Sequence, residues 1–135
     1  MKLLLVCVAA SAACASAPIR DPGACAAPAD RAEIVHVQVG WNRLDPSNRP
    51  PPADPAIPNR DPRQAEALAN DLLAQCRKGA RMEGLQDRYS EVPGGSVVVG
   101  PQARVPFRAA ALCLRKNECA LVRSDVAFYV LKRIE

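Results

Sequence analysis

The pattern of apolar and polar residues predicts a strand near the start of the chain and another at its end. Within residues 33–39 the valines fall on one face, and Ile34, His36 and Gln38 fall on the other. The closing run, residues 126–135, is rich in β-branched and aromatic residues and is largely apolar on both faces. A strand that is covered on both faces belongs inside a sheet rather than at its edge. We therefore expect the closing strand to lie in the middle of a sheet.

A helix is predicted between these two strands. Asp61 suits the N-cap, Pro62 suits the first helical position, and Gln64 can complete a capping box with Asp61. Gly79 can take the left-handed conformation that ends a helix. Apolar residues recur between these signals on one helical face: Ala65, Leu68, Ala69, Leu72, Leu73 and Cys76. The pattern predicts an amphipathic helix with one buried face.

Shorter elements are predicted in the rest of the chain. Prolines within residues 40–60 remove backbone donors, so this segment is expected to be a long surface loop. The later pattern predicts a second helix near residues 81–89, a buried strand over residues 97–99, a third helix begun by Pro106, and a strand over residues 119–122. With the closing strand, the order β-α-α-β-α-β-β predicts a fold of the α+β class.

The N-terminus has the pattern of an export signal. A positively charged start precedes an apolar run that is too short to span a bilayer, which takes about 20 residues. Residues 1–13 are therefore predicted to be a signal peptide. Residues 11–14 are similar to the signal of bacterial lipoproteins, which implies that Cys14 is acylated and anchors the protein to a membrane. Ordinary cleavage after Ala15 is the alternative.

Composition divides the rest of the chain into a spacer and one domain. Residues 14–31 are rich in Ala, Pro and Asp, which predicts a flexible spacer, and residues 32–135 form the predicted domain. The net charge of +4 is spread along the chain without a dense basic run, so we expect no nucleic-acid partner. Three arginines lie scattered among the prolines and are predicted to be solvated: Arg43, Arg49 and Arg60.

The cysteines leave several pairings open. Cys25, Cys76, Cys113 and Cys119 remain once the leader and Cys14 are set aside, and they allow three pairings in an exported protein. Free buried thiols are the expectation for Cys76 and Cys113, with a link between Cys113 and Cys119 as the alternative. The chain has one His and no Cys-x-x-Cys motif, so we expect no metal site and no cofactor.

The last third of the chain carries an ordered series of motifs. These are Gly94-Gly95, the apolar strand over residues 97–99, Gly100, Val105-Pro106-Phe107, Asn117-Glu118 and residues 132–135. The series resembles the C-terminal half of the parvulin class of peptidyl-prolyl cis-trans isomerases, and the element order over residues 33–135 is that of the class. The resemblance implies a four-stranded antiparallel sheet surrounded by helices.

The resemblance also implies a site. In the parvulin class, its floor includes a His on the first strand, a Cys or Asp after the second helix, and a second His on the last strand. His36 matches the first of these positions, Val92 stands near the second, and Tyr129 occupies the third. The resemblance implies catalytic roles for His36 and Tyr129 and a socket for the proline ring at Val97 and Phe107. A structural His36, hydrogen-bonded across the sheet, and a purely packing role for Val97 and Phe107 are the alternatives.

The functional expectation is an isomerase that acts on X-Pro bonds of exported proteins in the cell envelope, as a monomer with proline-containing polypeptides as partners. Tyr129 and Val92 depart from the parvulin pattern. They leave open a second function, in which the fold serves as a peptide-binding holdase or adaptor without catalysis. A small envelope lipoprotein unrelated to parvulins is the third alternative.

Overall fold

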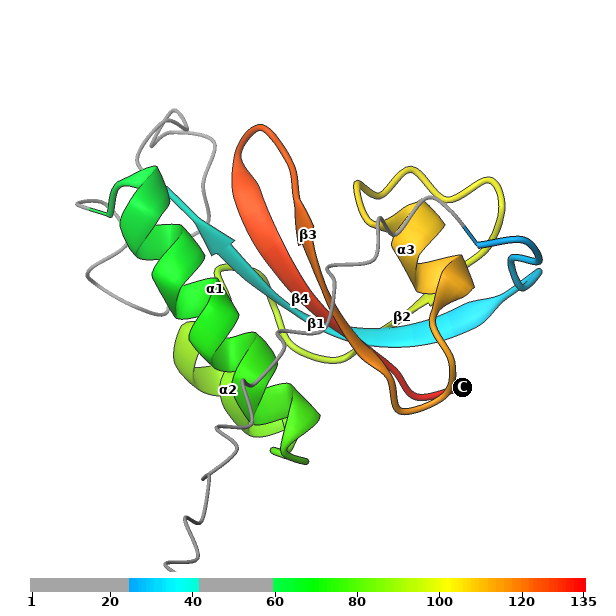
Figure 1. The fold of residues 1–135 in the computed structure, drawn as a ribbon, viewed down its shortest axis with the longest axis horizontal. Helices are drawn as coiled ribbons and strands as arrows, with labels where there is room; N and C mark the ends of the chain where they lie inside the picture. The colour runs from blue at the N-terminus through cyan, green and yellow to red at the C-terminus, as the bar shows by residue number, and fades with distance from the viewer. Residues whose placement is uncertain (1–24, 42–59) are drawn as a thin grey trace, which may run out of the picture.

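The computed structural model describes residues 25–41 and 60–135, and within them four strands and three helices follow one another in the predicted order (Figure 1). The elements are β1 (Ala32–Gly40), α1 (Pro62–Arg77), α2 (Met82–Tyr89), β2 (Ser96–Val99), α3 (Arg108–Cys113), β3 (Cys119–Arg123) and β4 (Ala127–Arg133). The predicted signal peptide, Cys14 and most of the proline-rich segment lie outside these residues.

The strands form one antiparallel sheet in the order β2-β1-β4-β3. The closing strand β4 lies between β1 and β3, and its residues from Ala127 to Leu131 are all buried. Its run of apolar residues is thus explained by cover on both faces. The α+β class and the four-stranded antiparallel sheet are confirmed.

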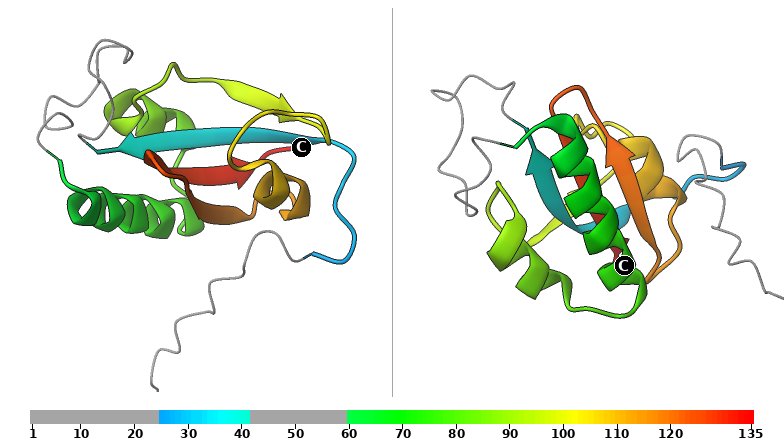
Figure 2. Two further views of the ribbon diagram at one scale, coloured as in Figure 1. Left: turned by 90° about the horizontal axis from the view of Figure 1, so that it is seen from above. Right: turned by 60° about the vertical axis from the view of Figure 1, so that its left-hand side comes forward.

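Each face of the sheet has its own hydrophobic core. Val35, Val37 and Val39 point to the face covered by α1 and α2, where they pack with Leu72 and Phe128. The right-hand view of Figure 2 shows α1 lying across the strands. The opposite core contains the buried side chains of α3 together with Ala32, Ile34, Val99, Phe107, Leu114, Val122, Ala127, Tyr129 and Leu131. The alternation read in residues 33–39 therefore separates two cores, not a core from solvent.

The start of α1 follows from its capping residues. The Asp61 carboxylate accepts a hydrogen bond from Gln64 N at 2.8 Å, and Gln64 Oε1 accepts one from Asp61 N at 2.9 Å. Pro62 occupies the first turn, where a missing N–H costs nothing. Gly79 follows the helix with a φ of 92°, a conformation that glycine adopts without strain. The predicted capping box is confirmed.

Three local expectations are wrong. The strand β2 is not buried: it lies at an edge of the sheet, and Val98 is 55% exposed. The helix α3 begins at Arg108, because Pro106 and Phe107 form the turn before it. Arg60, predicted to be solvated, is only 6% exposed.

Two disulfides replace the expected free thiols and the expected link between Cys113 and Cys119. Cys76 on α1 pairs with Cys119 on β3, with their Cα atoms 6.3 Å apart. Cys25 pairs with Cys113 at the end of α3, with a Cα separation of 5.7 Å. Ala29 N also donates a hydrogen bond to Leu112 O at 2.7 Å. Residues 25–31, which the sequence assigned to a flexible spacer, are therefore attached to the domain.

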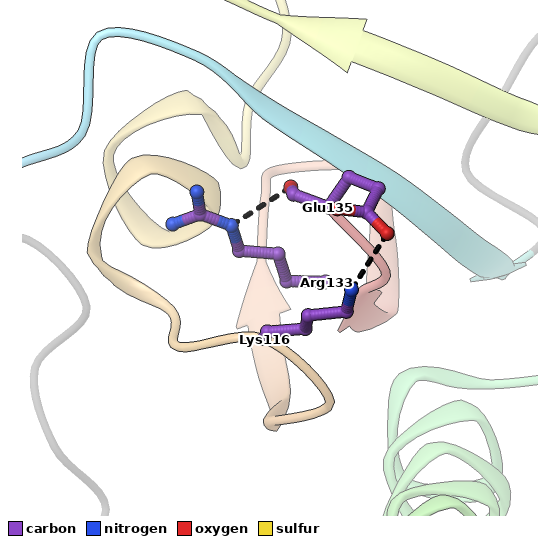
Figure 3. A network of polar contacts seen from close by, with 3 residues as sticks. All are labelled: Lys116, Arg133 and Glu135. Atoms are coloured by element: carbon purple, nitrogen blue, oxygen red, sulfur yellow. Dashed lines mark hydrogen bonds and ion pairs between the residues drawn. The ribbon is translucent and has the colours of Figure 1, made fainter.

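Polar contacts at the C-terminus hold the ends of several elements together (Figure 3). The guanidinium of Arg133 donates hydrogen bonds to the carbonyl oxygens of Glu135 at 2.8 Å, Leu114 at 2.8 Å and Arg31 at 3.2 Å. Lys116 Nζ lies 2.7 Å from Glu135 Oε1, and this hydrogen bond and charge lower the pKa of the exposed Glu135 carboxyl. Arg133 satisfies a carbonyl that the end of α3 leaves open, and so fixes α3 beside β1 and β4.

Candidate functional site

The strand β1 is longer than β2, its partner along one edge. Pairing between β1 and β2 ends at Val35 and Ser96, whereas β1 continues to Gly40 and pairs with β4 along its other edge. His36 is the first residue of β1 beyond the end of β2. The backbone groups from His36 onward therefore need partners that a strand does not supply.

The end of α2 and the two residues after it supply these partners. Gln86 Nε2 donates to His36 O at 2.9 Å, and Ser90 Oγ accepts from Gln38 N at 3.2 Å. Two further bonds complete the row: Glu91 N to Gln38 O at 3.1 Å, and Gly40 N to Glu91 Oε1 at 2.9 Å. The end of α2 and residues 90–91 thus fix the backbone of the strand that carries His36.

Three aromatic rings meet beside this backbone. His36 on β1, Phe107 in the turn before α3 and Tyr129 on β4 form a cluster on the face that α3 covers. The His36 ring centroid lies 4.8 Å from that of Phe107 and 6.3 Å from that of Tyr129, and the last two are 5.4 Å apart. The rings are tilted by 43° to 53°, an arrangement that aromatic pairs favour. We call these three residues the ring cluster.

His36 is held neutral in this cluster. Burial lowers the pKa of its imidazole, because the charged form loses hydration. Its Nδ1 atom is buried and makes no hydrogen bond with any residue that the structure describes. Within residues 25–41 and 60–135, His36 is therefore not a structural histidine that is hydrogen-bonded across the sheet through Nδ1. A neutral imidazole offers one donor and one acceptor, so this ring retains capacity for a further hydrogen bond.

The proposed socket residues lie on the same face of the sheet. Phe107 is 3% exposed and Tyr129 is 5% exposed, and both belong to the core under α3. Val97 is partly buried, packs against that core and lies opposite Ile34 across the strand pair. The structure therefore brings together the four residues that the sequence selected: His36, Val97, Phe107 and Tyr129.

The position of Val92 lacks the polar group found in parvulins. Val92 follows Glu91 directly and is partly buried, and its backbone N donates to Ser90 Oγ at 3.5 Å. Its isopropyl group can neither donate nor accept a hydrogen bond. The neighbouring residue Glu91 is 4% exposed, and its carboxylate accepts a hydrogen bond from Gly40 N. An added Cβ on Gly40 would lie 2.7 Å from Glu91 Oε2, so a larger residue there would displace this carboxylate.

Sequence reasoning missed Gln86, Ser90 and Glu91 as residues that bond the edge of β1 beyond the end of β2. A signal was present for one of them, because Gln86 shares the helical face of Met82, Leu85 and Tyr89. A polar residue on a predicted buried face needs buried partners, and here these are backbone groups of β1 and of the turn before β2.

Other features of the described residues do not add to the site. A hollow of about 330 Å³ is lined by Arg31, Glu33 and Glu135, near the start of β1 and away from the ring cluster. Within residues 25–41 and 60–135, no group of three or more His, Cys, Asp or Glu side chains is placed to hold a metal ion. None of the helices there is both long and apolar enough to cross a membrane.

The element order, the antiparallel sheet β2-β1-β4-β3 and the helices on its two faces define a parvulin-like fold. Among solved structures, the chain is similar to the solution structure of TbPIN1, a parvulin, with a TM-score of 0.64 and 16% sequence identity. The match covers 78% of this chain and 98% of that one. No protein-family model matches the chain, and no curated protein is significantly similar to it. The likeness therefore rests on the fold.

Proposed function

We propose that this domain is a peptidyl-prolyl cis-trans isomerase. The observation that carries the proposal is the partly buried His36 imidazole, whose pKa is lowered and whose Nδ1 makes no hydrogen bond with the described residues, beside Phe107 and Tyr129 on the sheet of a parvulin-like fold. Buried polar groups in proteins are normally hydrogen-bonded, so a buried Nδ1 without such a bond marks His36 as a candidate functional residue.

The chemistry requires few groups. Rotation about a peptide bond faces a barrier of about 18–20 kcal/mol, which a pocket lowers by binding the twisted amide more tightly than either planar form. The partly buried Val97 would contact the proline ring, and Phe107, in the core behind it, would support that contact. His36 and the Tyr129 hydroxyl would form hydrogen bonds with the amide as it loses conjugation. No nucleophile, metal or cofactor takes part.

A protease-free isomerisation assay on a series of proline tetrapeptides tests this proposal with the purified chain. We expect acceleration by the wild type and a loss of about tenfold or more in His36→Ala, because one oriented hydrogen-bonding group is removed. A folded His36→Ala variant with an unchanged rate would remove the role assigned to His36. A folded wild type without acceleration would refute the enzyme.

A second function is favoured by two particular residues, Val92 and Tyr129, which replace polar groups of the parvulin pattern. Without these polar groups, the fold could serve as a peptide-binding holdase or adaptor. The double variant Val92→Asp with Tyr129→His separates the two functions, since a faded enzyme gains rate without gaining affinity. A wild type that already accelerates isomerisation strongly would leave the adaptor without support.

The proposed setting is the cell envelope, with proline-containing exported polypeptides as substrates of a monomeric enzyme. The two disulfides support this setting, because such bonds persist in oxidising compartments. We propose further that Cys14 carries the lipid anchor. The intact mass of protein from a membrane fraction should show acyl chains that Cys14→Ala lacks, and a mass of the unmodified cleaved chain would contradict the anchor.

A further inference from the structure

The carboxamide of Gln86 lies where the pairing of β1 with β2 stops. The next pair in the register would be His36 with Gly95, one step beyond Val35 and Ser96. Instead, Gln86 Nε2 donates to His36 O at 2.9 Å and to Gly95 O at 2.9 Å. Gln86 Oε1 accepts from Gly95 N at 3.1 Å. The side chain thus takes the place of a peptide group between the two strands.

This arrangement fixes the orientation of the carboxamide. Two carbonyl oxygens face its NH₂ group and one backbone N–H faces its oxygen, so the reversed amide would oppose like atoms at all three contacts. Gln86 is 4% exposed, which makes the loss of these bonds costly. The three bonds use three of the four that a carboxamide can form.

The turn that Gln86 holds leads directly to the proposed socket. Gly95 has a φ of 113°, a conformation that other residues rarely adopt. An added Cβ on Gly94 would lie 3.3 Å from Gln86 Oε1, so the glycine at this position allows the close approach of the carboxamide. Two residues after Gly95, the chain reaches Val97. One side chain therefore connects the backbone of His36 to the start of the strand that carries Val97.

We propose that Gln86 is a positioning residue of the site: its carboxamide sets the backbone of His36 relative to the Gly94-Gly95 turn, and with it the imidazole relative to the proline socket. This inference rests on the proposed function for its effect on catalysis, but the placement of His36 can be tested separately. Ser90 and Glu91 bond the same edge of β1 farther along, at Gln38 and Gly40, and do not bond the backbone of His36 itself.

The chain offers a clean readout, because His36 is its only histidine. The test compares wild type, Gln86→Met and Gln86→Glu with the control Ser90→Ala, by NMR titration of the imidazole and by the isomerisation assay. Gln86→Met keeps the length of the side chain and loses all three bonds. Gln86→Glu keeps an acceptor for Gly95 N but places a carboxylate oxygen against two carbonyls. Ser90→Ala removes a neighbouring bond of the same edge, at Gln38 N.

We expect Gln86→Met to raise the pKa of His36 toward its ordinary value of 6.5, because a displaced imidazole is better hydrated, whereas the negative charge of Gln86→Glu raises that pKa by itself. We expect kcat/KM to fall by about tenfold or more, as small displacements of catalytic groups have large effects on rate. Ser90→Ala should lower stability and leave the pKa of His36 unchanged. Variants of Gln86 that lose stability while both readouts stay at wild-type values would overturn the proposal.

A measurement on the wild type covers the case in which the variants do not fold. A scalar coupling across the hydrogen bond should connect Gln86 ¹⁵Nε2 with the carbonyl ¹³C of His36, and its absence would refute the contact. If the wild type has no isomerase activity, the proposed function fails, whereas the coupling and the titration still decide whether Gln86 positions His36.

Discussion

His36 illustrates how one residue can serve a site at a cost in stability. Its ring packs 4.8 Å from Phe107, measured between centroids, and its Nδ1 is buried without a hydrogen bond to the described residues. A buried polar atom without a partner destabilises the folded state. The three rings of the cluster offset this cost through aromatic contact and burial. A locally unfavourable residue of this kind is consistent with the functional site that we propose.

The first prediction concerns the pH dependence of stability. Burial lowers the pKa of His36 in the folded state below its ordinary value of 6.5. As pH falls through that value, the unfolded chain takes up a proton that the folded chain does not, so the free energy of unfolding decreases. Below the folded-state pKa of His36, the free energy of unfolding decreases no further because of this residue, since it is then protonated in both states. His36→Phe keeps an aromatic ring and should lack this component.

Urea unfolding of both proteins between pH 7.5 and 5 measures the difference. Carboxylates contribute to acid destabilisation in each protein, and subtracting the two curves removes that common part. A constant difference across this range would contradict the assignment, because it would mean that His36 titrates equally in both states.

At the scale of elements, some strands and turns carry the residues of the ring cluster, and other elements support them through hydrogen bonds and packing. The strands β1 and β4 place His36 and Tyr129, and the turn before α3 places Phe107. Gln86 of α2 and Ser90, directly after this helix, bond the edge of β1 beyond β2. The helix α1 covers the opposite face and contributes through packing and through its disulfide to β3. A change at the start of α1 should therefore affect stability and not the ring cluster.

The second prediction uses the capping box of α1. Asp61→Ala removes the acceptor of Gln64 N and should lower the free energy of unfolding by about 1 kcal/mol. Asp71→Ala is the matched control on the same helix, because Asp71 accepts only an exposed bond from Gln75 and should cost about 0.2–0.5 kcal/mol. Chemical unfolding measures both, and equal losses would show that the cap contributes no more than an exposed pair.

At the scale of the whole molecule, disulfides and the C-terminal contacts join segments that are far apart in sequence. The Cys76–Cys119 bond spans 43 residues and the Cys25–Cys113 bond spans 88. Arg133 adds hydrogen bonds to residues before β1 and after α3. A small domain of low aromatic content gains from such links, because its core alone supplies limited stabilisation.

The third prediction ranks the two disulfides. Loop closure gives the Cys76–Cys119 bond about 4 kcal/mol of stabilisation, and replacing both residues by Ser should lose most of it. Replacing Cys25 and Cys113 should cost less despite the longer span. The reason is that the exposed residues 26–28 can then detach and regain chain entropy while the domain stays folded. Urea unfolding of the two double variants decides the order, and a larger loss for Cys25 and Cys113 would contradict it.

The sequence by itself determined the element order, the capping box of α1 and the central place of β4, because these depend on local periodicity and turn chemistry. The resemblance of its ordered motifs to the parvulin class also pointed to His36, Val97, Phe107 and Tyr129. Each of these signals is carried by residues that lie close together in the chain or follow one another in a fixed order.

Only the tertiary structure decided the disulfide pairing, the exposure of β2 and the role of Gln86. Pairing of four cysteines depends on which Cα atoms come within about 6 Å, and this distance depends on how the sheet and helices pack. The apolar run at residues 97–99 does not show whether its strand lies at an edge or in the interior of the sheet. The order of the strands depends on partners elsewhere in the chain. Gln86 bonds His36, which is 50 residues away in the sequence, because β1 extends beyond the end of β2. The function that we propose for Gln86 therefore depends on the register of these two strands, which no local pattern encodes.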